Sequence, residues 1–280
     1  MGAPPSWQVG CDLGFSVEER ATVALQIAVA DAPGRTVDDL LTVTLDGRPL
    51  PGVRTLAGPH GGRLHHLEAP VGQLDITYRA TVSGPDDAAA ATTAAEPGDD
   101  DYQRLLALRP SRYCPSDALL GFAAGELADR DADGDLARDV VAWVSNRIVY
   151  VPGSSGPLDT AVDTLLAGQG VCRDFAHLAV GLARALGIPS RLVAAYAPGL
   201  SPMDFHAVVE AWVDGGWHVL DPTHLAPRAS LLRMATGRDA ADTAFADVVR
   251  GVAVLTRMEV GAVLDGVLPL DEWGALVRLP

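Results

Sequence analysis

The spacing of apolar residues changes once along the chain, and this change is the strongest constraint on the fold. Up to about residue 83, apolar and polar side chains alternate, most regularly over residues 74–82, as they do along half-buried β-strands. Beyond about residue 102, apolar side chains recur at four-residue intervals, as in the segment 135–148, which is typical of a helix with one buried face. Strands followed by helices predict an α+β fold.

The same pattern divides the chain into three regions, and two domains are the natural expectation for 280 residues. Residues 1–83 form a predicted antiparallel β-sandwich-like domain, in which Asp46-Gly47 marks a tight hairpin turn. Residues 84–101 hold an Ala/Thr run, two prolines and three consecutive aspartates without apolar periodicity, so we expect a flexible linker. Residues 102–280 form the predicted core. Its predicted helices are 117–127, 135–148, 160–166 and 172–186, and its predicted strands are 191–196, 206–213, 217–220 and 252–260.

Composition excludes several classes of function. Hydrophobic residues make up 48% of the chain, which is enough to build buried cores and argues against a disordered protein. The formal charge of −15 and the absence of lysine argue against binding to nucleic acid or to an anionic membrane. The absence of lysine also excludes a Schiff-base mechanism and a P-loop, because both need an amine.

No sequence feature predicts secretion or membrane insertion. The first residues form no charged and apolar leader, and no apolar run approaches the roughly 18 residues of a membrane span. The three cysteines, Cys11, Cys114 and Cys172, are widely spaced and form no Cys-x-x-Cys pair, which argues against a disulfide framework or a zinc ribbon. We therefore expect a reducing, cytoplasmic location.

Cys172 lies where a glycine-rich turn, Gly168-Gln169-Gly170-Val171, meets an apolar helical run. A cysteine is nucleophilic as the thiolate, and a helix N-terminus lowers the thiol pKa from its ordinary value of about 8.5. The unpaired amides of the same helix terminus can also hold the oxyanion that forms when sulfur attacks a carbonyl. The alternative for Cys172 is a small buried residue with a packing role.

A nucleophilic cysteine needs a base and a group that orients the base, and His206 and Asp221 are the candidates. If Asp214-Gly215 is a two-residue turn, Val208 pairs with Asp221, and His206 becomes the diagonal neighbour of Asp221 within side-chain reach. A one-residue slip would send Asp221 to the opposite face. A packed histidine and an Asp-Pro turn are the alternatives, but the order of cysteine, helix, histidine, hairpin and aspartate favours catalysis.

Four blocks of the chain closely resemble the core of the transglutaminase-like superfamily, in the order and spacing of that family. They are 170–178 (GVCRDFAHL), 187–191 (GIPSR), 204–207 (DFHA) and 217–223 (WHVLDPT). Three further segments, 110–114, 150–154 and 235–242, resemble a bacterial branch that carries a β domain before the core. The resemblance is strong over residues 102–260 and weaker before them. It implies a papain-like core with a Cys-His-Asp triad at Cys172, His206 and Asp221.

The superfamily includes protein crosslinkers, peptidases, amide synthases, thioester cyclases and inactive relatives, so the fold alone does not define the reaction. The resemblance implies cysteine-dependent acyl transfer or hydrolysis at an amide or thioester carbonyl of a peptide-like or acyl-thioester substrate, through a thioester acyl-enzyme. Two alternatives stay open. One is amide formation or Dieckmann-type cyclisation on a carrier-protein-bound thioester, and the other is a catalytically inactive binding module. The mechanism requires no metal and no organic cofactor.

Two more residues near the nucleophile are candidates for contact with substrate. Tyr150 can supply an oxyanion donor, although a core or surface tyrosine is an equal alternative. Gln169 resembles the upstream glutamine of papain-like proteases, at a shorter spacing than expected. The segment 129–134 matches the first half of an EF-hand loop, but Val140 stands where the loop needs a bidentate glutamate, so we expect a solvated acidic loop there.

Overall fold

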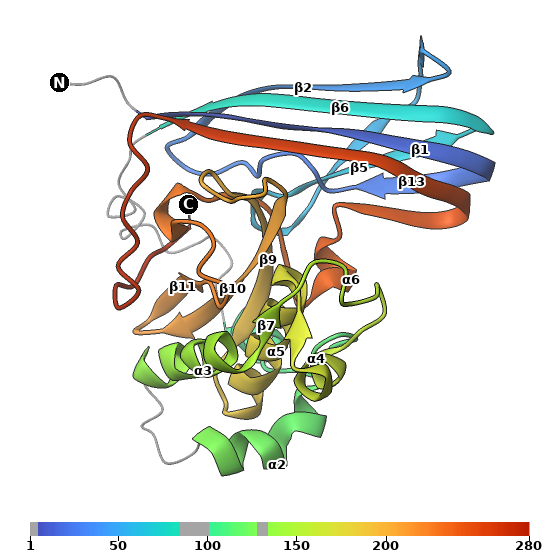
Figure 1. The fold of residues 1–280 in the computed structure, drawn as a ribbon. Helices are drawn as coiled ribbons and strands as arrows, with labels where there is room; N and C mark the ends of the chain where they lie inside the picture. The colour runs from blue at the N-terminus through green and yellow to red at the C-terminus, as the bar shows by residue number, and fades with distance from the viewer. Residues whose placement is uncertain (1–4, 85–100, 128–133, 280) are drawn as a thin grey trace.

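The computed structural model describes residues 5–84, 101–127 and 134–279, and places a long curled sheet against a smaller unit of helices and a second sheet (Figure 1). Residues 85–100, most of the predicted linker, and residues 128–133, most of the EF-hand-like loop, lie outside the described residues. The strands are β1 (Ser6–Leu25), β2 (Thr36–Leu45), β3 (Arg48–Pro49), β4 (Arg54–Ala57), β5 (Arg63–Ala69), β6 (Gly72–Ser83), β7 (Val149–Tyr150), β8 (Gln169–Gly170), β9 (Ser190–Tyr196), β10 (Phe205–Val213), β11 (Gly216–Leu220), β12 (Leu232–Gly237) and β13 (Ala246–Asp265). The helices are α1 (Asp101–Leu106), α2 (Ser116–Leu127), α3 (Gly134–Arg147), α4 (Ala161–Ala167), α5 (Cys172–Ala185) and α6 (Ala240–Thr243), with short 3₁₀ turns at Pro59–Gly61 and Arg228–Ser230.

Seven of the eight predicted elements of the core are confirmed within one residue at each end, because their apolar spacing reflects real burial. The eighth, the strand predicted at 252–260, is part of the longer strand β13. The predicted helices correspond to α2, α3, α4 and α5, and the three predicted strands that follow correspond to β9, β10 and β11. Among the described residues, no helix combines the length and the apolar character needed to cross a membrane.

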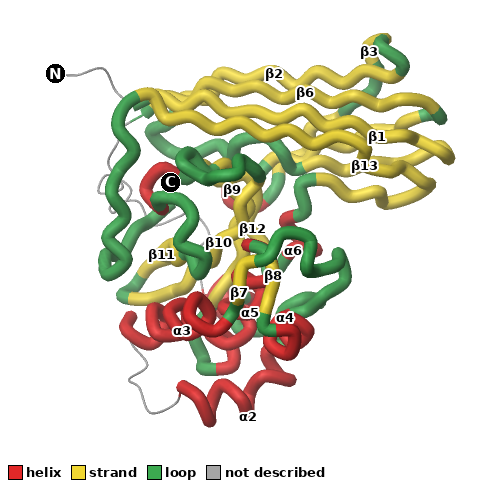
Figure 2. Tube along the Cα trace, viewed as in Figure 1, coloured by secondary structure: helices red, strands yellow, loops and turns green. Residues whose placement is uncertain are grey.

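The first sheet is antiparallel, as predicted, and is organised around the 20-residue strand β1. One edge of β1 pairs with β6 over residues 6–17 and then with β5 over residues 21–25, and the other edge pairs with β13 along its whole length. Because β1 is long enough to carry two strands in succession, the expected two-layer sandwich is replaced by one seven-stranded sheet that curls (Figure 2).

The strand β13 comes from the predicted core region 102–280, yet it belongs to the first sheet. The predicted boundaries at residues 83 and 102 therefore do not coincide with the two sheets. The alternation over residues 252–260 correctly indicated a strand, but such a pattern indicates the buried face of a strand and not its pairing partner.

The second sheet has the order β11-β10-β9-β12, and α5 packs against β9 and β10. The helices α2, α3 and α4 surround α5, so most of its side chains are buried (Figure 1). This burial fixes the direction of α5, and with it the position of its first residue, Cys172.

The two sheets share one apolar core. Tyr196, Leu232 and Met234 of the second sheet pack among the buried side chains of the first. The Tyr196 hydroxyl donates to the Ile27 carbonyl at 2.8 Å, and the Trp7 indole donates to the Ser230 carbonyl at 3.1 Å. The curled sheet is therefore a fixed part of the molecule that carries the core.

A buried ion network joins three strands of the second sheet. The Glu210 carboxylate on β10 accepts hydrogen bonds from Arg191 Nε on β9 at 2.8 Å and from Arg233 Nη2 on β12 at 2.6 Å. Burial alone would raise the Glu210 pKa, but the charges of Arg191 and Arg233 outweigh it and lower the pKa to about 2. The folded state thus holds this carboxylate ionised between two guanidinium groups.

We expect Glu210→Gln to lower the free energy of unfolding at pH 7 by about 3–5 kcal/mol, because two buried cations lose their counter-charge. The folded pKa lies below the ordinary glutamate value, so the stabilisation by Glu210 is present above pH 4.5 and is lost as pH falls toward about 2. Urea unfolding at pH 7 and pH 3 measures both effects. The difference in the free energy of unfolding between wild type and variant should be smaller at pH 3 than at pH 7.

Glu68→Gln is the matched control, because the Glu68 side chain is half exposed, and its ion pair with Arg20 and its hydrogen bond from the Thr22 hydroxyl both lie at the surface. If Glu210→Gln were as stable as the control at pH 7, the stabilising role of ionised Glu210 between the two arginines would be contradicted.

Candidate active site

Cys172 is the cysteine that solvent reaches. It is the first residue of α5 and is partly exposed, whereas Cys11 and Cys114 are buried. Burial raises the pKa of Cys11 to about 11 and that of Cys114 to about 12. Those two thiols are therefore protonated and inaccessible at neutral pH, and Cys172 remains as the candidate nucleophile.

A buried carboxylate holds the N-terminus of α5 in place. The Asp174 carboxylate accepts from the Val171 backbone N–H at 2.8 Å, from the Arg173 guanidinium at 2.9 Å and from the Ser155 hydroxyl. Arg173 also donates to the Gly156 carbonyl at 2.8 Å. These bonds tie the loop after β7 to the first turn of the helix, and an acid in the first turn is also favoured by the helix dipole.

A short parallel pairing brings Tyr150 to the nucleophile. In the β7–β8 pair, Tyr150 lies opposite Gly170, two residues before Cys172. The Tyr150 hydroxyl interacts with both the backbone N–H and the thiol of Cys172. Burial, followed by negative charge on Cys172, raises the Tyr150 pKa to about 12, so the phenol remains a proton donor at neutral pH.

The structure does not bring Gln169 to the same place. Its side chain is exposed, and within the described part of the chain it makes no hydrogen bond to Cys172, His206 or Asp221. Its backbone lies opposite Val149 in the β7–β8 pair. Gly170 and Val171, the two residues between Gln169 and Cys172, form the turn into α5.

The β10–β11 hairpin has the register that joins His206 to Asp221. Asp214 and Gly215 have φ angles of 49° and 73°, as in a two-residue turn with both central residues left-handed. Val213 lies opposite Gly216, so the predicted register is confirmed. His206 Nε2 and Asp221 Oδ2 are 2.8 Å apart, and both side chains are fully buried.

Asp221 is held as an ionised acceptor. Its Oδ1 accepts from the Thr223 backbone N–H at 2.8 Å and from the Thr223 hydroxyl at 2.7 Å, which leaves Oδ2 for His206. Burial alone would raise the Asp221 pKa, but the charge of His206 and the hydrogen bonds from His206 and Thr223 lower it. Asp221 therefore both begins the Asp-Pro turn and orients His206.

The imidazole of His206 is held between an acid and the thiol. Burial alone would lower the His206 pKa, but Asp221 and then Cys172 raise it to about 10. Among the described residues, the other ring nitrogen, Nδ1, has no hydrogen-bond partner, so it is available to Cys172. Stabilisation by the charged ring is fully present below pH 6.5 and is lost as pH rises through about 10.

One acid at the site was missed by the sequence analysis. Asp204 lies two residues before His206, and its charge acts on both His206 and Tyr150. Burial raises the Asp204 pKa, although the carboxylate also accepts from the Phe205 backbone N–H at 2.7 Å. The two-residue spacing from His206 was the signal that could have identified it, because alternate residues of an extended chain share a face.

Comparisons with known proteins agree on the core and extend the likeness to the whole chain. Residues 122–222 match the model of the transglutaminase-like superfamily. The structure of a proposed cysteine protease from Cytophaga hutchinsonii has a TM-score of 0.85 and 30% identity, over 98% of this chain and 96% of that one. Uncharacterised proteins of Mycobacterium leprae and Mycobacterium tuberculosis are 29% and 30% identical over 49% and 48% of this chain. The chain spans about half the length of these two curated relatives.

Gly170 offers a test of how tightly the nucleophile is positioned. A Cβ atom at Gly170 would lie 2.6 Å from Asp174 Cβ, so Gly170→Ala must displace either β8 or the start of α5. We expect a loss of about 1–3 kcal/mol in the free energy of unfolding and slower alkylation of Cys172, measured by urea unfolding and by mass spectrometry.

Gly125→Ala in α2 is the matched control, because no atom lies within 4 Å of the added Cβ. An alanine there should stabilise the helix by about 1 kcal/mol and leave Cys172 unaffected. Equal stability and equal alkylation rates in the two variants would show that Gly170 does not position the thiol.

Proposed function

The chain belongs to the transglutaminase-like superfamily, and we propose that it is a cysteine-dependent enzyme that cleaves or transfers acyl groups at amide carbonyls of a peptide-like substrate. One observation carries the proposal. A partly exposed cysteine at a helix N-terminus lies beside a buried histidine, and a buried aspartate orients that histidine. These are the three roles that nucleophilic acyl transfer requires.

In the proposed mechanism, Cys172 and His206 rest as a thiolate and an imidazolium. The raised His206 pKa of about 10 supports the imidazolium at neutral pH. The positive ring and the N-terminus of α5 both favour negative charge on the sulfur. The sulfur attacks the substrate carbonyl and forms a tetrahedral intermediate with a negative oxygen. His206 then gives its proton to the leaving amine, and the carbon–nitrogen bond breaks to leave a thioester on Cys172. Asp221 keeps the ring oriented while its charge changes.

In the second half-reaction, water or an amine attacks the thioester. Neutral His206 accepts the proton of the attacking group, the carbon–sulfur bond breaks, and Cys172 leaves as the thiolate. The product is an acid when water attacks and a new amide when an amine attacks. The Cys172 backbone N–H and the Tyr150 hydroxyl are the proposed oxyanion donors, because both lie next to the sulfur.

The Cytophaga protein is described as a proposed cysteine protease, and its likeness to this chain includes the curled sheet as well as the core. This likeness favours amide cleavage over the other reactions of the superfamily. The exposure of Cys172 and the available Nδ1 of His206 argue against an inactive binding module, in which the thiol would have no reason to remain accessible.

The test compares amide and thioester substrates on the same protein. We expect a peptide mixture to give an acyl adduct on Cys172, detectable by mass spectrometry, and Cys172→Ala to form none. Asp221→Asn should lower the rate of acylation by about 100-fold or more, because the ring loses its ionised partner. Tyr150→Phe should lower it by about 100-fold, the usual effect of removing one oxyanion donor.

Tyr102→Phe is the matched control, because the Tyr102 side chain on α1 is largely exposed. If only thioesters acylated Cys172, the substrate class would instead be carrier-bound thioesters. If neither class acylated Cys172, the proposal would be wrong.

A further inference from the structure

The last strand of the first sheet has one unpaired edge. β13 pairs with β1 along one side, and none of the described strands pairs with its other side. The strand lies at a border of the sheet (Figures 1 and 2). Its 20 residues make it much longer than the usual edge strand, and natural proteins cover, charge or interrupt such edges because the free N–H and C=O groups invite another strand.

The exposed surface of β13 is unusually apolar for an edge. Val249 and Val263 are 63% and 62% exposed, and Val254 is 47% exposed. Val267, directly after the strand, is 93% exposed. Scattered apolar side chains are ordinary on a protein surface, and only Val263 of these four lies in the uninterrupted stretch 257–265. The free backbone groups of the edge are therefore the stronger signal for a second strand.

The regular part of β13 is the stretch 257–265. It pairs without interruption with residues 6–14 of β1, and the register shifts at Leu255–Arg257, where Thr256 bulges out. Within the stretch, Arg257, Glu259 and Gly261 alternate with Met258 and Val260. The first three therefore face the outer surface of the sheet. Val260 packs against the apolar core on the other side, and Met258 lies on that same side but is 38% exposed.

This stretch is complementary to itself in the antiparallel direction. When two copies are aligned about Gly261, Arg257 of one lies opposite Asp265 of the other, and this pair occurs twice. On the inner face, Met258 lies opposite Leu264. If one copy slides along the other by two residues in one direction, Glu259 of each copy lies opposite Asp265 of the other, and like charges face each other. If it slides by two residues in the opposite direction, both ion pairs are lost. One register is therefore favoured over its neighbours.

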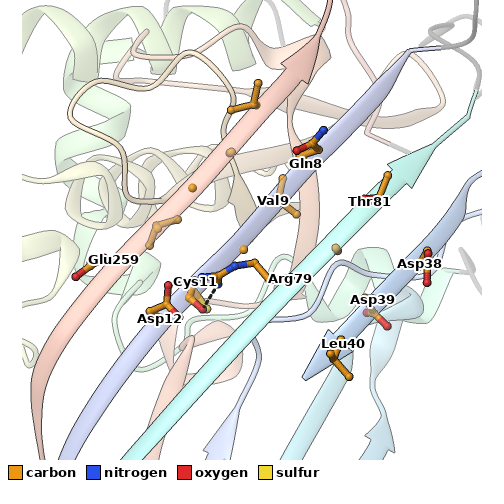
Figure 3. Close-up of a pocket in the computed structure, with 16 residues that line it drawn as sticks. Gln8, Val9, Cys11, Asp12, Asp38, Asp39, Leu40, Arg79, Thr81 and Glu259 are labelled. Carbon is orange, nitrogen blue, oxygen red and sulfur yellow. Dashed lines mark hydrogen bonds and ion pairs between the residues drawn. The ribbon is translucent and has the colours of Figure 1, made fainter. Parts of the chain in front are cut away.

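The outer face leaves room at the centre of this alignment. Gly10 and Gly261 are neighbours across β1 and β13, and a groove of about 620 Å³ lies over this part of the sheet, with Arg79 in its lining (Figure 3). No atom lies within 4 Å of a Cβ added at Gly261, whereas the Arg79 side chain lies over Gly10. Glu259 and Val263 border the groove on β13. Arg257 is held on the same face by an ion pair with Asp75 at 3.0 Å, with both side chains partly exposed, so it can also reach a second acid.

We propose that β13 is a dimerisation edge, through which two copies of the chain pair antiparallel over residues 257–265 about Gly261. The two first sheets then form one continuous sheet, in which Val263 of one copy lies opposite Glu259 of the other. This assembly involves a different sheet from the one that carries His206, and it stands independently of the proposed reaction.

The test is the association state of the full chain and of two charge-reversed variants, measured by sedimentation velocity over a range of concentrations. Wild type should be a dimer. Arg257→Glu and Asp265→Arg should each weaken self-association by roughly tenfold or more, because each variant places like charges opposite each other at both ends of the stretch. An equimolar mixture of the two variants should recover the dimer, because each mixed pair again joins opposite charges.

Arg250→Glu is the matched control on the same strand, outside the paired stretch, and should dimerise like wild type. Recovery on mixing cannot come from misfolded chains, so it separates lost pairing from lost folding. A monomeric wild type, single variants that dimerise like wild type, or a mixture that stays monomeric would each overturn the proposal.

Discussion

The register of the β10–β11 hairpin is the constraint on which the candidate site depends. Asp214 and Gly215 both adopt left-handed backbone angles, and this turn sets every pair of opposing residues that follows. A slip of one residue would turn Asp221 away from His206 and leave a buried carboxylate without its partner. Because the hydrogen bond between them is buried at both ends, the hairpin and the pair stabilise each other.

The position of the nucleophile depends on a second set of buried contacts. Asp174 joins the first turn of α5 to the loop after β7, and the β7–β8 pair brings Tyr150 beside Cys172. The helices around α5 fix its axis, and the Asp174 contacts fix its first turn. The site therefore forms where two independently held elements meet, which is the arrangement that keeps reacting groups in a fixed geometry.

Local patterns in the sequence predicted the core well. Four-residue spacing located α3, and the cysteine, histidine and aspartate were identified by order and by counting through a hairpin. Pairing between distant segments was not predictable in the same way. The pattern identified part of β13 as a strand but could not assign it to β1, and glycines such as Gly10 and Gly14 hide the alternation of β1 itself. Asp204 was missed because its role depends on neighbours brought together by the fold.

The central claim is that His206 activates Cys172, and the most direct test is the rate of Cys172 alkylation by iodoacetamide from pH 5 to pH 9, followed by mass spectrometry. Cys11 and Cys114 serve as internal references, because burial protects both. The account predicts rapid labelling of Cys172 already at pH 6, and at least tenfold slower labelling at pH 6 in His206→Ala, with a rate that rises steeply with pH as for an ordinary thiol. Labelling of Cys172 that follows the ordinary thiol profile in wild type, and is unchanged in His206→Ala, would contradict it.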